Sequence, residues 1–175
     1  QEWSPAWGVK KSVRDRYRSL LVKLRRSDNQ MRCDFEIRTY DDGCAFRYLF
    51  PDTLQDVKIL HELTQFRFAE NAGCWWAWAD YNTLEKTYQH TSLGSALHVA
   101  LPFTMQFQNG ACVTVHEAGI DDYTTMTLLR SDNDSTSFTA NLVPWSDGTA
   151  VKTSAPFSTP WRVLFVAPDP AALLA

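Results

Sequence analysis

Short runs in which hydrophobic and polar residues alternate recur along the chain and indicate β-strands. The alternation is clearest in four runs: Phe35–Tyr40, Cys44–Phe50, Leu101–Phe107 and Ala111–Glu117. A half-buried strand has this period because successive side chains point to opposite faces of the sheet. Asp41-Asp42-Gly43 separates the first two runs and Asn109-Gly110 separates the last two, and both are turn sequences that close hairpins. We therefore expect two β-hairpins, the first of them ending at Pro51.

Further strands are expected where the alternation is shorter, at Ile59–Phe68, Met126–Arg130, Phe138–Val143 and Trp161–Val166. Residues 81–93 have a mixed pattern typical of a loop or a short helix, and the proline-containing stretch before Trp161 is expected to be a polar loop. Many short strands with turns between them predict an all-β fold, a β-sandwich, which forms a single domain over residues 1–166. Residues 167–175 contain two prolines and are expected to form a linker.

The most basic part of the chain, Lys10–Arg26, has two possible structures. Its leucines recur at helical spacing, but Leu20, Val22 and Leu24 also alternate with the residues between them, as in a strand. A strand at the edge of a sheet, protected by Lys and Arg from pairing with another chain, is favoured over a basic helix. Nucleic-acid binding through this segment is the alternative, and it predicts binding that weakens steeply with salt.

The amino-acid composition argues against some classes of protein. The 175 residues include seven Trp and are 45% hydrophobic, which suits a folded domain, and the net charge of −3 argues against a nucleic-acid-binding protein. No apolar run is long enough for a membrane-spanning helix, and no membrane span is expected. The spacing of the four cysteines fits no paired zinc-ligand pattern. They are expected to be small buried residues, although one disulfide remains possible.

Acidic residues are densest directly after the strand that ends near residue 117. Glu117, Asp121 and Asp122 follow His116 within a few positions, and Tyr123 comes next. Carboxylates at a strand end supply the oxygen ligands and the charge that Ca²⁺ prefers. The simpler alternative is a solvated exit from a strand into a loop, because acidic loop residues usually lie on the surface.

Three tryptophans, Trp75, Trp76 and Trp78, form a second cluster with candidate chemistry. Indole rings stack well on sugar rings, but aromatic clusters more often belong to a core or an interface. Enzymatic motifs are missing from the sequence: neither His61-Glu62 nor His116-Glu117 is followed by the second His of a zinc protease, and there is no Gly-x-Ser-x-Gly nucleophile elbow.

Several motifs together resemble the N-terminal domain of glycoside hydrolase family 97. They are Arg38–Pro51, the stretch from His116-Glu117-Ala118 through Asp122-Tyr123 to Met126-Thr127-Leu128, Thr159–Val163, Trp3–Gly8 and Val13-Arg14-Asp15. The resemblance covers nearly the whole chain. It implies a large β-sandwich of the galactose-mutarotase type, here as an incomplete copy that lacks the first strands of the family and stops where a catalytic barrel should begin.

The resemblance also implies a role in a larger enzyme. Family members are exo-acting α-glucosidases or α-galactosidases, mostly from Bacteroidetes, in which a (β/α)₈ barrel carries the catalytic residues and a small β-domain follows it. The sandwich contributes loops to the substrate pocket and one glutamate to a Ca²⁺ site, and by motif position that glutamate is Glu117. His116, Tyr123 and the three tryptophans are further candidates for the pocket. The parent protein is expected to be periplasmic or secreted.

This chain is therefore expected to be non-catalytic, to pack against the barrel and the C-terminal β-domain of its parent, and to act on an α-glycoside only within the intact enzyme. Uncovered sheet edges are expected to make it self-associate. The alternative is a free-standing carbohydrate-binding β-sandwich that holds glycans through Trp75, Trp76 and Trp78.

Overall fold

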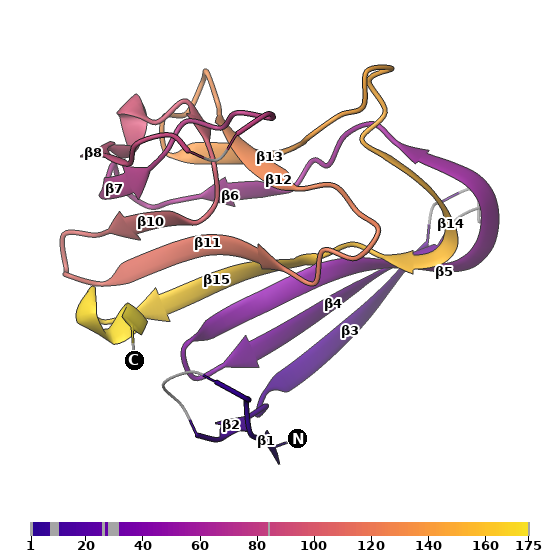
Figure 1. Ribbon diagram of the computed structural model, residues 1–175, viewed down its shortest axis with the longest axis horizontal. Helices are drawn as coiled ribbons and strands as arrows, with labels where there is room; N and C mark the ends of the chain where they lie inside the picture. The colour runs from indigo at the N-terminus through magenta and orange to yellow at the C-terminus, as the bar shows by residue number, and fades with distance from the viewer. Residues whose placement is uncertain (1, 8–10, 26, 28–31, 84, 175) are drawn as a thin grey trace.

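Two antiparallel sheets lie one above the other in the computed structural model, which describes residues 2–7, 11–25, 27, 32–83 and 85–174 (Figure 1). The larger sheet has the strand order β3-β4-β5-β15-β11-β10-β7-β8, and β14 pairs with the far half of β5. The smaller sheet has the order β6-β13-β12-β9. The all-β sandwich that the sequence predicts is confirmed.

The strands of the larger sheet are β3 (Arg18–Arg25), β4 (Arg32–Tyr40), β5 (Gly43–Ile59), β7 (Gly73–Trp76), β8 (Gln89–Ser92), β10 (Phe103–Gln106), β11 (Cys112–Ala118), β14 (Val151–Ser158) and β15 (Trp161–Ala167). Those of the smaller sheet are β6 (Gln65–Arg67), β9 (His98–Val99), β12 (Met126–Arg130) and β13 (Ser137–Leu142). A separate hairpin joins β1 (Glu2–Trp3) to β2 (Val13–Arg14), and two 3₁₀ turns are η1 (Leu93–Ser95) and η2 (Ala171–Leu174), the latter within the expected linker.

Both predicted hairpins are present. β4 pairs with β5 across the Asp41-Asp42 turn, and β10 pairs with β11 across a turn in which Gly110 has a positive φ of 89°. Gly43 has a more specific role, since a Cβ atom there would lie 2.1 Å from the carbonyl oxygen of Leu164 on β15. The close approach of β5 to β15 therefore requires glycine at position 43.

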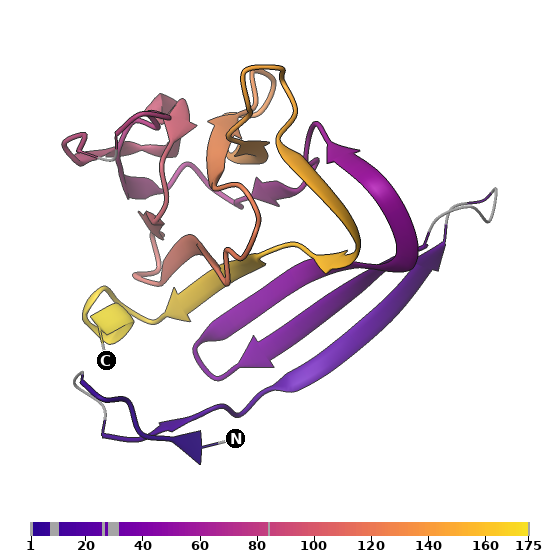
Figure 2. The ribbon, with the colours of Figure 1, turned by 45° about the vertical axis from the view of Figure 1, so that its right-hand side comes forward.

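The prediction that Pro51 ends its strand is wrong. β5 continues to Ile59, pairing first with β4 and β15 and then with β14 (Figure 2). Pro51 follows Phe50, which pairs with Phe157, at a point where the register between β5 and β14 shifts. A proline can occupy such an irregularity because no regular ladder hydrogen bond needs its missing N–H there.

The polar loop predicted before Trp161 and the strand predicted over Ile59–Phe68 also need correction. β14 lies inside the stretch that was expected to be a polar loop. Its side chains do alternate between inner and exposed positions, but the polar Thr153 at an inner position and Pro156 at an exposed one hide this pattern in the sequence. The strand predicted over Ile59–Phe68 is divided, because β5 ends at Ile59 and β6 covers only Gln65–Arg67. The mixed segment 81–93 ends in the edge strand β8.

β3 is an edge strand, as its basic and alternating pattern predicts. β3, β4 and β5 extend beyond the smaller sheet (Figures 1 and 2), and Leu20 and Leu24 on β3 are 58% and 50% exposed. This end of the larger sheet therefore presents apolar side chains to solvent.

The core fills the space between the two sheets. Phe103, Met105 and Val115 from the larger sheet pack with Met126 and Phe138 from the smaller one, and all five are fully buried. Cys74 and Cys112 are buried, as expected, whereas Cys33 and Cys44 are only half-buried, and all four thiols are free. None of the described helical segments is long and apolar enough to cross a membrane.

Candidate functional site

A buried arginine joins two glutamates at one end of the space between the sheets. β11 and β15 pair in a register that places Glu117 opposite Arg162, so both side chains point to the same face of the sheet. Arg162 is completely buried and Glu117 is 6% exposed. The third member, Glu62, lies in the segment between β5 and β6 and is also buried.

Arg162 donates hydrogen bonds to both carboxylates. Its Nε lies 2.9 Å from Oε1 of Glu62 and its Nη2 lies 2.5 Å from Oε2, which makes a two-pronged ion pair. Its Nη1 donates a single hydrogen bond of 2.8 Å to Oε2 of Glu117. Because buried charges must be paired to be tolerated, these contacts explain how three ionisable groups occupy an interior position.

Neutral donors complete the cluster. The hydroxyl of Thr64 donates to Oε1 of Glu62 at 2.8 Å, and the hydroxyl groups of Tyr48 and Thr64 are 2.9 Å apart. The backbone N–H of Met126 lies 3.0 Å and 3.2 Å from the two carboxylate oxygens of Glu117. The cluster thus ties β5, β11, β12 and β15 together.

Burial and the neighbouring charges shift the pKa values of Glu117, Arg162 and Tyr123. Burial raises the pKa of Glu117, although the Met126 N–H and Arg162 oppose this effect. Burial works to lower the pKa of Arg162, but Glu62 and Glu117 outweigh it and raise that pKa. The phenol of Tyr123 lies beside the cluster, with its ring centroid 6.0 Å from Cζ of Arg162, and burial together with the charge of Glu62 raises its pKa.

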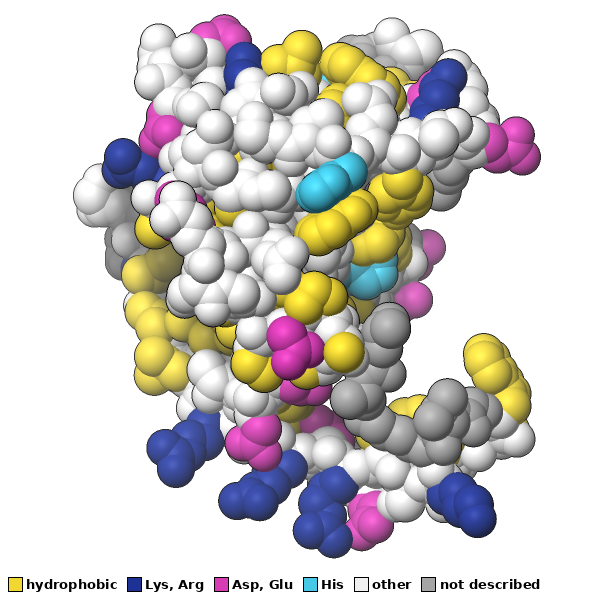
Figure 3. All heavy atoms as spheres, turned by 90° about the vertical axis from the view of Figure 1, so that its left-hand side faces the viewer, with side chains coloured by type: hydrophobic (Ala, Val, Ile, Leu, Met, Phe, Trp, Pro, Cys, Tyr) yellow, Lys and Arg dark blue, Asp and Glu magenta, His cyan; other side chains and the backbone are white. Residues whose placement is uncertain are grey.

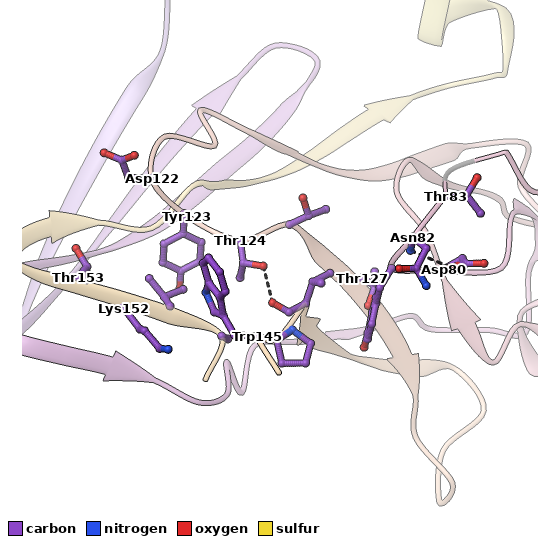
Figure 4. A pocket seen from close by; sticks show the side chains of 16 residues that line it. Asp80, Asn82, Thr83, Asp122, Tyr123, Thr124, Thr127, Trp145, Lys152 and Thr153 are labelled. Carbon is purple, nitrogen blue, oxygen red and sulfur yellow. Dashed lines mark hydrogen bonds between the residues drawn. The ribbon is translucent and has the colours of Figure 1, made fainter. Parts of the chain in front are cut away.

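Tyr123 connects this cluster to an open groove of about 960 Å³ (Figure 4). The groove is lined by residues of three loops and the ends of β12 and β14, namely 80–83, 122–125, Thr127, 143–145 and 150–153. In Figure 4 the rings of Tyr123 and Trp145 lie with Lys152 at one end, and Asp80, Asn82 and Thr83 lie at the other. The groove therefore combines aromatic faces with carboxylate, amide, hydroxyl and amino groups.

Side chains in the groove are held by local contacts. Lys152 forms a 2.7 Å ion pair with Asp147, and its amino group lies 5.6 Å from the ring of Trp145. Trp145 is 63% exposed. At the other end the hydroxyl of Tyr81 accepts a 2.8 Å hydrogen bond from Nδ2 of Asn141. The aromatic rings are thus positioned and still accessible, which suits stacking against an apolar sugar face.

Of the residues that the sequence singled out, Glu117 and Tyr123 lie at this site. His116 does not, because it follows the alternation of β11 and points to the opposite face from Glu117. Burial lowers the pKa of His116, and its buried Nδ1 has no hydrogen-bond partner within the described part of the chain.

None of the three candidate tryptophans lines the groove. Trp75 stacks on His90 with ring centroids 4.4 Å apart. The face drawn in Figure 3 shows His side chains next to hydrophobic ones. Trp76 is buried in the core and donates to the hydroxyl of Thr91 at 3.0 Å, and Trp78 packs edge-on against it. They form no common platform for a sugar.

Sequence reasoning missed Glu62 and Arg162 as site residues. Arg162 stands in the apolar run Trp161-Arg162-Val163-Leu164-Phe165, and a charge within a buried strand was the available signal, since such a charge needs a partner. The partner could not be read from the sequence, because Glu62 lies 100 residues away.

The donor chemistry of the cluster suits Ca²⁺ only in part. A carboxylate offers about four lone-pair positions, and those of Glu117 receive the Met126 N–H and one N–H of Arg162, so capacity remains. Across the residues that the structure describes, no group of three or more His, Cys, Asp or Glu side chains could hold a metal ion. Because Ca²⁺ takes about six to eight oxygens, Glu117 fits as one ligand of a site that needs others.

Comparisons with known proteins agree on one family. The family model described as Glycosyl-hydrolase 97 N-terminal matches residues 1–175. A variant of a Glycoside Hydrolase Family 97 enzyme from Pseudoalteromonas sp. strain K8 superimposes with a TM-score of 0.90 at 32% identity, over 97% of this chain and 26% of the enzyme. The same enzyme in complex with acarbose gives a TM-score of 0.87 at 32% identity, with the same coverage.

A variant of that enzyme in complex with panose matches 99% of this chain and 27% of the enzyme, with a TM-score of 0.90 and 32% identity. A β-arabinopyranosidase structure shares the fold at 21% identity, with a TM-score of 0.84 over 97% of this chain and 30% of that one. The chain thus spans about a quarter of the length of the enzymes it matches.

Proposed function

The chain belongs to the glycosyl-hydrolase 97 N-terminal family, and we propose that it serves as the non-catalytic N-terminal β-sandwich of an exo-acting α-glycosidase. The observation that carries this proposal is the superposition of nearly the whole chain on one quarter of a family 97 enzyme. That enzyme has been solved with acarbose and with panose. The substrate of the parent of this chain is accordingly an α-glycoside.

The sandwich does no bond cleavage in this proposal. Glu62 and Glu117, the two carboxylates of the buried cluster, both accept hydrogen bonds from Arg162 and are shielded from solvent. A glycosidase acid and its partner carboxylate must instead flank the bond that breaks. We infer from the family resemblance that the catalytic residues belong to a (β/α)₈ barrel of the same parent chain, against which the sandwich and a C-terminal β-domain pack.

The groove supplies the contribution of this chain to the substrate pocket. Tyr81, Tyr123 and Trp145 offer ring faces to the apolar side of a sugar, while Asp80 and Lys152 offer hydrogen-bonding groups to its hydroxyls. These residues lie on loops held by the two sheets, a position from which they can complete a pocket that another domain encloses.

Glu117 is the residue that would hold Ca²⁺ on behalf of this domain. Arg162 and the Met126 N–H fix its carboxylate, and Met126 is flanked by Thr125 and Thr127, which line the groove. A Ca²⁺ ion bound there would supply positive charge and fixed coordination positions at the boundary between domains. Ligands from the barrel would complete its shell. We propose that the parent enzyme acts in the periplasm or outside the cell.

The proposal is tested on the native product that contains this sequence. Its intact mass in the source cells is expected to be several times the 20.0 kDa of this chain. α-Glycosidase activity should co-purify with it and fall when Ca²⁺ is chelated. A native product of this size without glycosidase activity, which saturates with a glycan, would overturn the proposal in favour of a free-standing binding module.

A further inference from the structure

Arg162 divides its hydrogen bonds unequally between the two glutamates. Nε and Nη2 both bind Glu62, whereas only Nη1 binds Glu117. A two-pronged arginine–carboxylate pair is stronger and more directional than a single contact. The guanidinium of Arg162 therefore interacts more strongly with Glu62 than with Glu117.

Glu62 is also the better satisfied of the two carboxylates by neutral donors from side chains. The Thr64 hydroxyl donates to its Oε1, and Tyr48 lies within hydrogen-bond distance of Thr64. Thr64 therefore gives Glu62 a donor in addition to those of Arg162. Glu62 thus has three donors and holds Arg162 in one orientation.

The charges of the cluster do not cancel. Two carboxylates face one guanidinium, and in the ionised cluster one negative charge is left over. Because Glu62 takes two of the three N–H contacts, the surplus lies mainly on Glu117. Glu117 in turn is bonded to Met126, between two residues that line the groove, so the surplus charge lies next to the place where a ligand would enter.

We propose that Glu62 is a positioning residue for Glu117: by occupying the fork of Arg162, it leaves Glu117 both oriented and negatively charged for a cation. Without Glu62, the whole charge of Arg162 would fall on Glu117 and neutralise it. This inference rests on the proposed Ca²⁺ role of Glu117, and it adds that the cation affinity of Glu117 depends on a residue that does not itself bind the ion.

The test measures cation binding by the intact parent enzyme that contains this sequence, because the barrel supplies the other ligands, with Tb³⁺ as a luminescent substitute for Ca²⁺ and Ca²⁺ as competitor. Glu117→Gln should abolish the saturable component of the titration. Glu62→Gln should weaken it about tenfold or more, which is the usual effect of losing an outer-shell partner of a metal ligand. Circular dichroism and tryptophan fluorescence must show that each variant is folded.

Glu36→Gln is the matched control. Glu36 is also a shielded carboxylate between two arginines, Arg38 and Arg47, but it lies elsewhere on the larger sheet. Its substitution should leave the Tb³⁺ affinity unchanged. If Glu62→Gln does not fold, Thr64→Val decides, because it removes a donor to Glu62 while keeping every charge, and it should weaken binding about threefold, a milder outer-shell effect.

The possible outcomes separate this inference from the function on which it rests. Wild-type affinity in folded Glu62→Gln, or in Thr64→Val, combined with loss of binding in Glu117→Gln, overturns the role of Glu62 and leaves the metal role of Glu117 standing. Absence of saturable binding by the wild-type parent enzyme, or full binding by its Glu117→Gln variant, overturns the metal role and this inference with it.

Discussion

Glu117 and Arg162 meet in the interior because β11 and β15 pair in the register that sets these two residues directly opposite each other. The contact between Oε2 and Nη1 is 2.8 Å. Shifting this pairing by one residue would turn one of the two side chains to the other face of the sheet and break the contact between them. The buried ion pair and the register of the sheet therefore support each other.

Replacing Arg162 by methionine should severely destabilise the fold. The substitution leaves Glu62 and Glu117 buried without a cation, and breaking a buried ion pair in this way costs about 3–5 kcal/mol. Urea unfolding followed by tryptophan fluorescence measures the change. Arg67→Met is the matched control, because the Arg67–Asp134 pair is exposed and such pairs contribute roughly 1 kcal/mol or less. Equal losses for the two variants would contradict this account.

The isolated chain should not hydrolyse an aryl α-glucoside, with or without Ca²⁺. Arg162 holds both Glu62 and Glu117 in the interior, so neither can protonate a leaving group or attack a sugar. Release of the aryl group is followed by absorbance over a long incubation. Turnover that depends on Ca²⁺ and survives further purification would refute the prediction.

Stability should fall as the pH drops below about 6.5, the ordinary pKa of histidine. Burial lowers the pKa of His98, whose Nε2 is 2.9 Å from the hydroxyl of Thr127. As the pH falls below the pKa that His98 has in the unfolded chain, the unfolded chain binds a proton and the folded chain does not. Stability therefore decreases until the pH reaches the lower pKa that His98 has in the folded chain. His116 acts in the same direction.

The check compares unfolding free energies at pH 7.5 and 5.5. His98→Gln should make the difference between the two pH values smaller, whatever its effect on stability at either one. His61→Gln, at an exposed position, is the control and should leave the difference as it is in the wild type. An unchanged difference in His98→Gln would exclude His98 as its source.

Gly43→Ala should be markedly destabilising. The added Cβ would lie 2.1 Å from the carbonyl oxygen of Leu164, so β5 or β15 must shift, at a cost of roughly 2 kcal/mol or more. Gly148 offers a matched control, because its φ of 81° also disfavours alanine but no atom lies within 4 Å of the added Cβ. Gly148→Ala should cost only about 1 kcal/mol from backbone strain. The two unfolding midpoints should differ accordingly.

The open edge at β3 should make the chain self-associate at high concentration. Leu20 and Leu24 are largely exposed on a strand at the edge of the sheet, where they can add to apolar contacts between chains. Replacing both by serine should shift the chain towards monomer on size-exclusion chromatography with light scattering. Leu63→Ser, in a loop at an 83% exposed position, should not. A wild-type chain that stays monomeric at high concentration would count against the prediction.

Local features of the sequence were enough to predict the sandwich, the two hairpins and the edge position of β3. The turns at Asp41-Asp42-Gly43 and Asn109-Gly110 are chemical signals within a few residues, and alternation needs only a strand and a core. β14 was not predicted because Thr153 is polar at an inner position and Pro156 lies within the strand, so its sequence lacks a clear alternation of hydrophobic and polar residues.

The site was less predictable. Glu117 stood out because carboxylates are dense around it, and Tyr123 followed it in the chain. Its partners Arg162 and Glu62 are brought in by pairings between distant segments, which no local pattern encodes. In contrast, the separation of Trp75 from Trp76 follows from the period of two in a strand, which places neighbours on opposite faces.

The buried cluster also sets an order of events during synthesis. Glu62 and Glu117 leave the ribosome long before Arg162, which is 100 residues after the first and 45 after the second. Until that arginine emerges, neither acid can be enclosed in an apolar interior at low cost. The buried cluster can therefore form only after β15 has been synthesised. Its formation is a late step that joins distant parts of the chain, and we expect folding to be correspondingly slow.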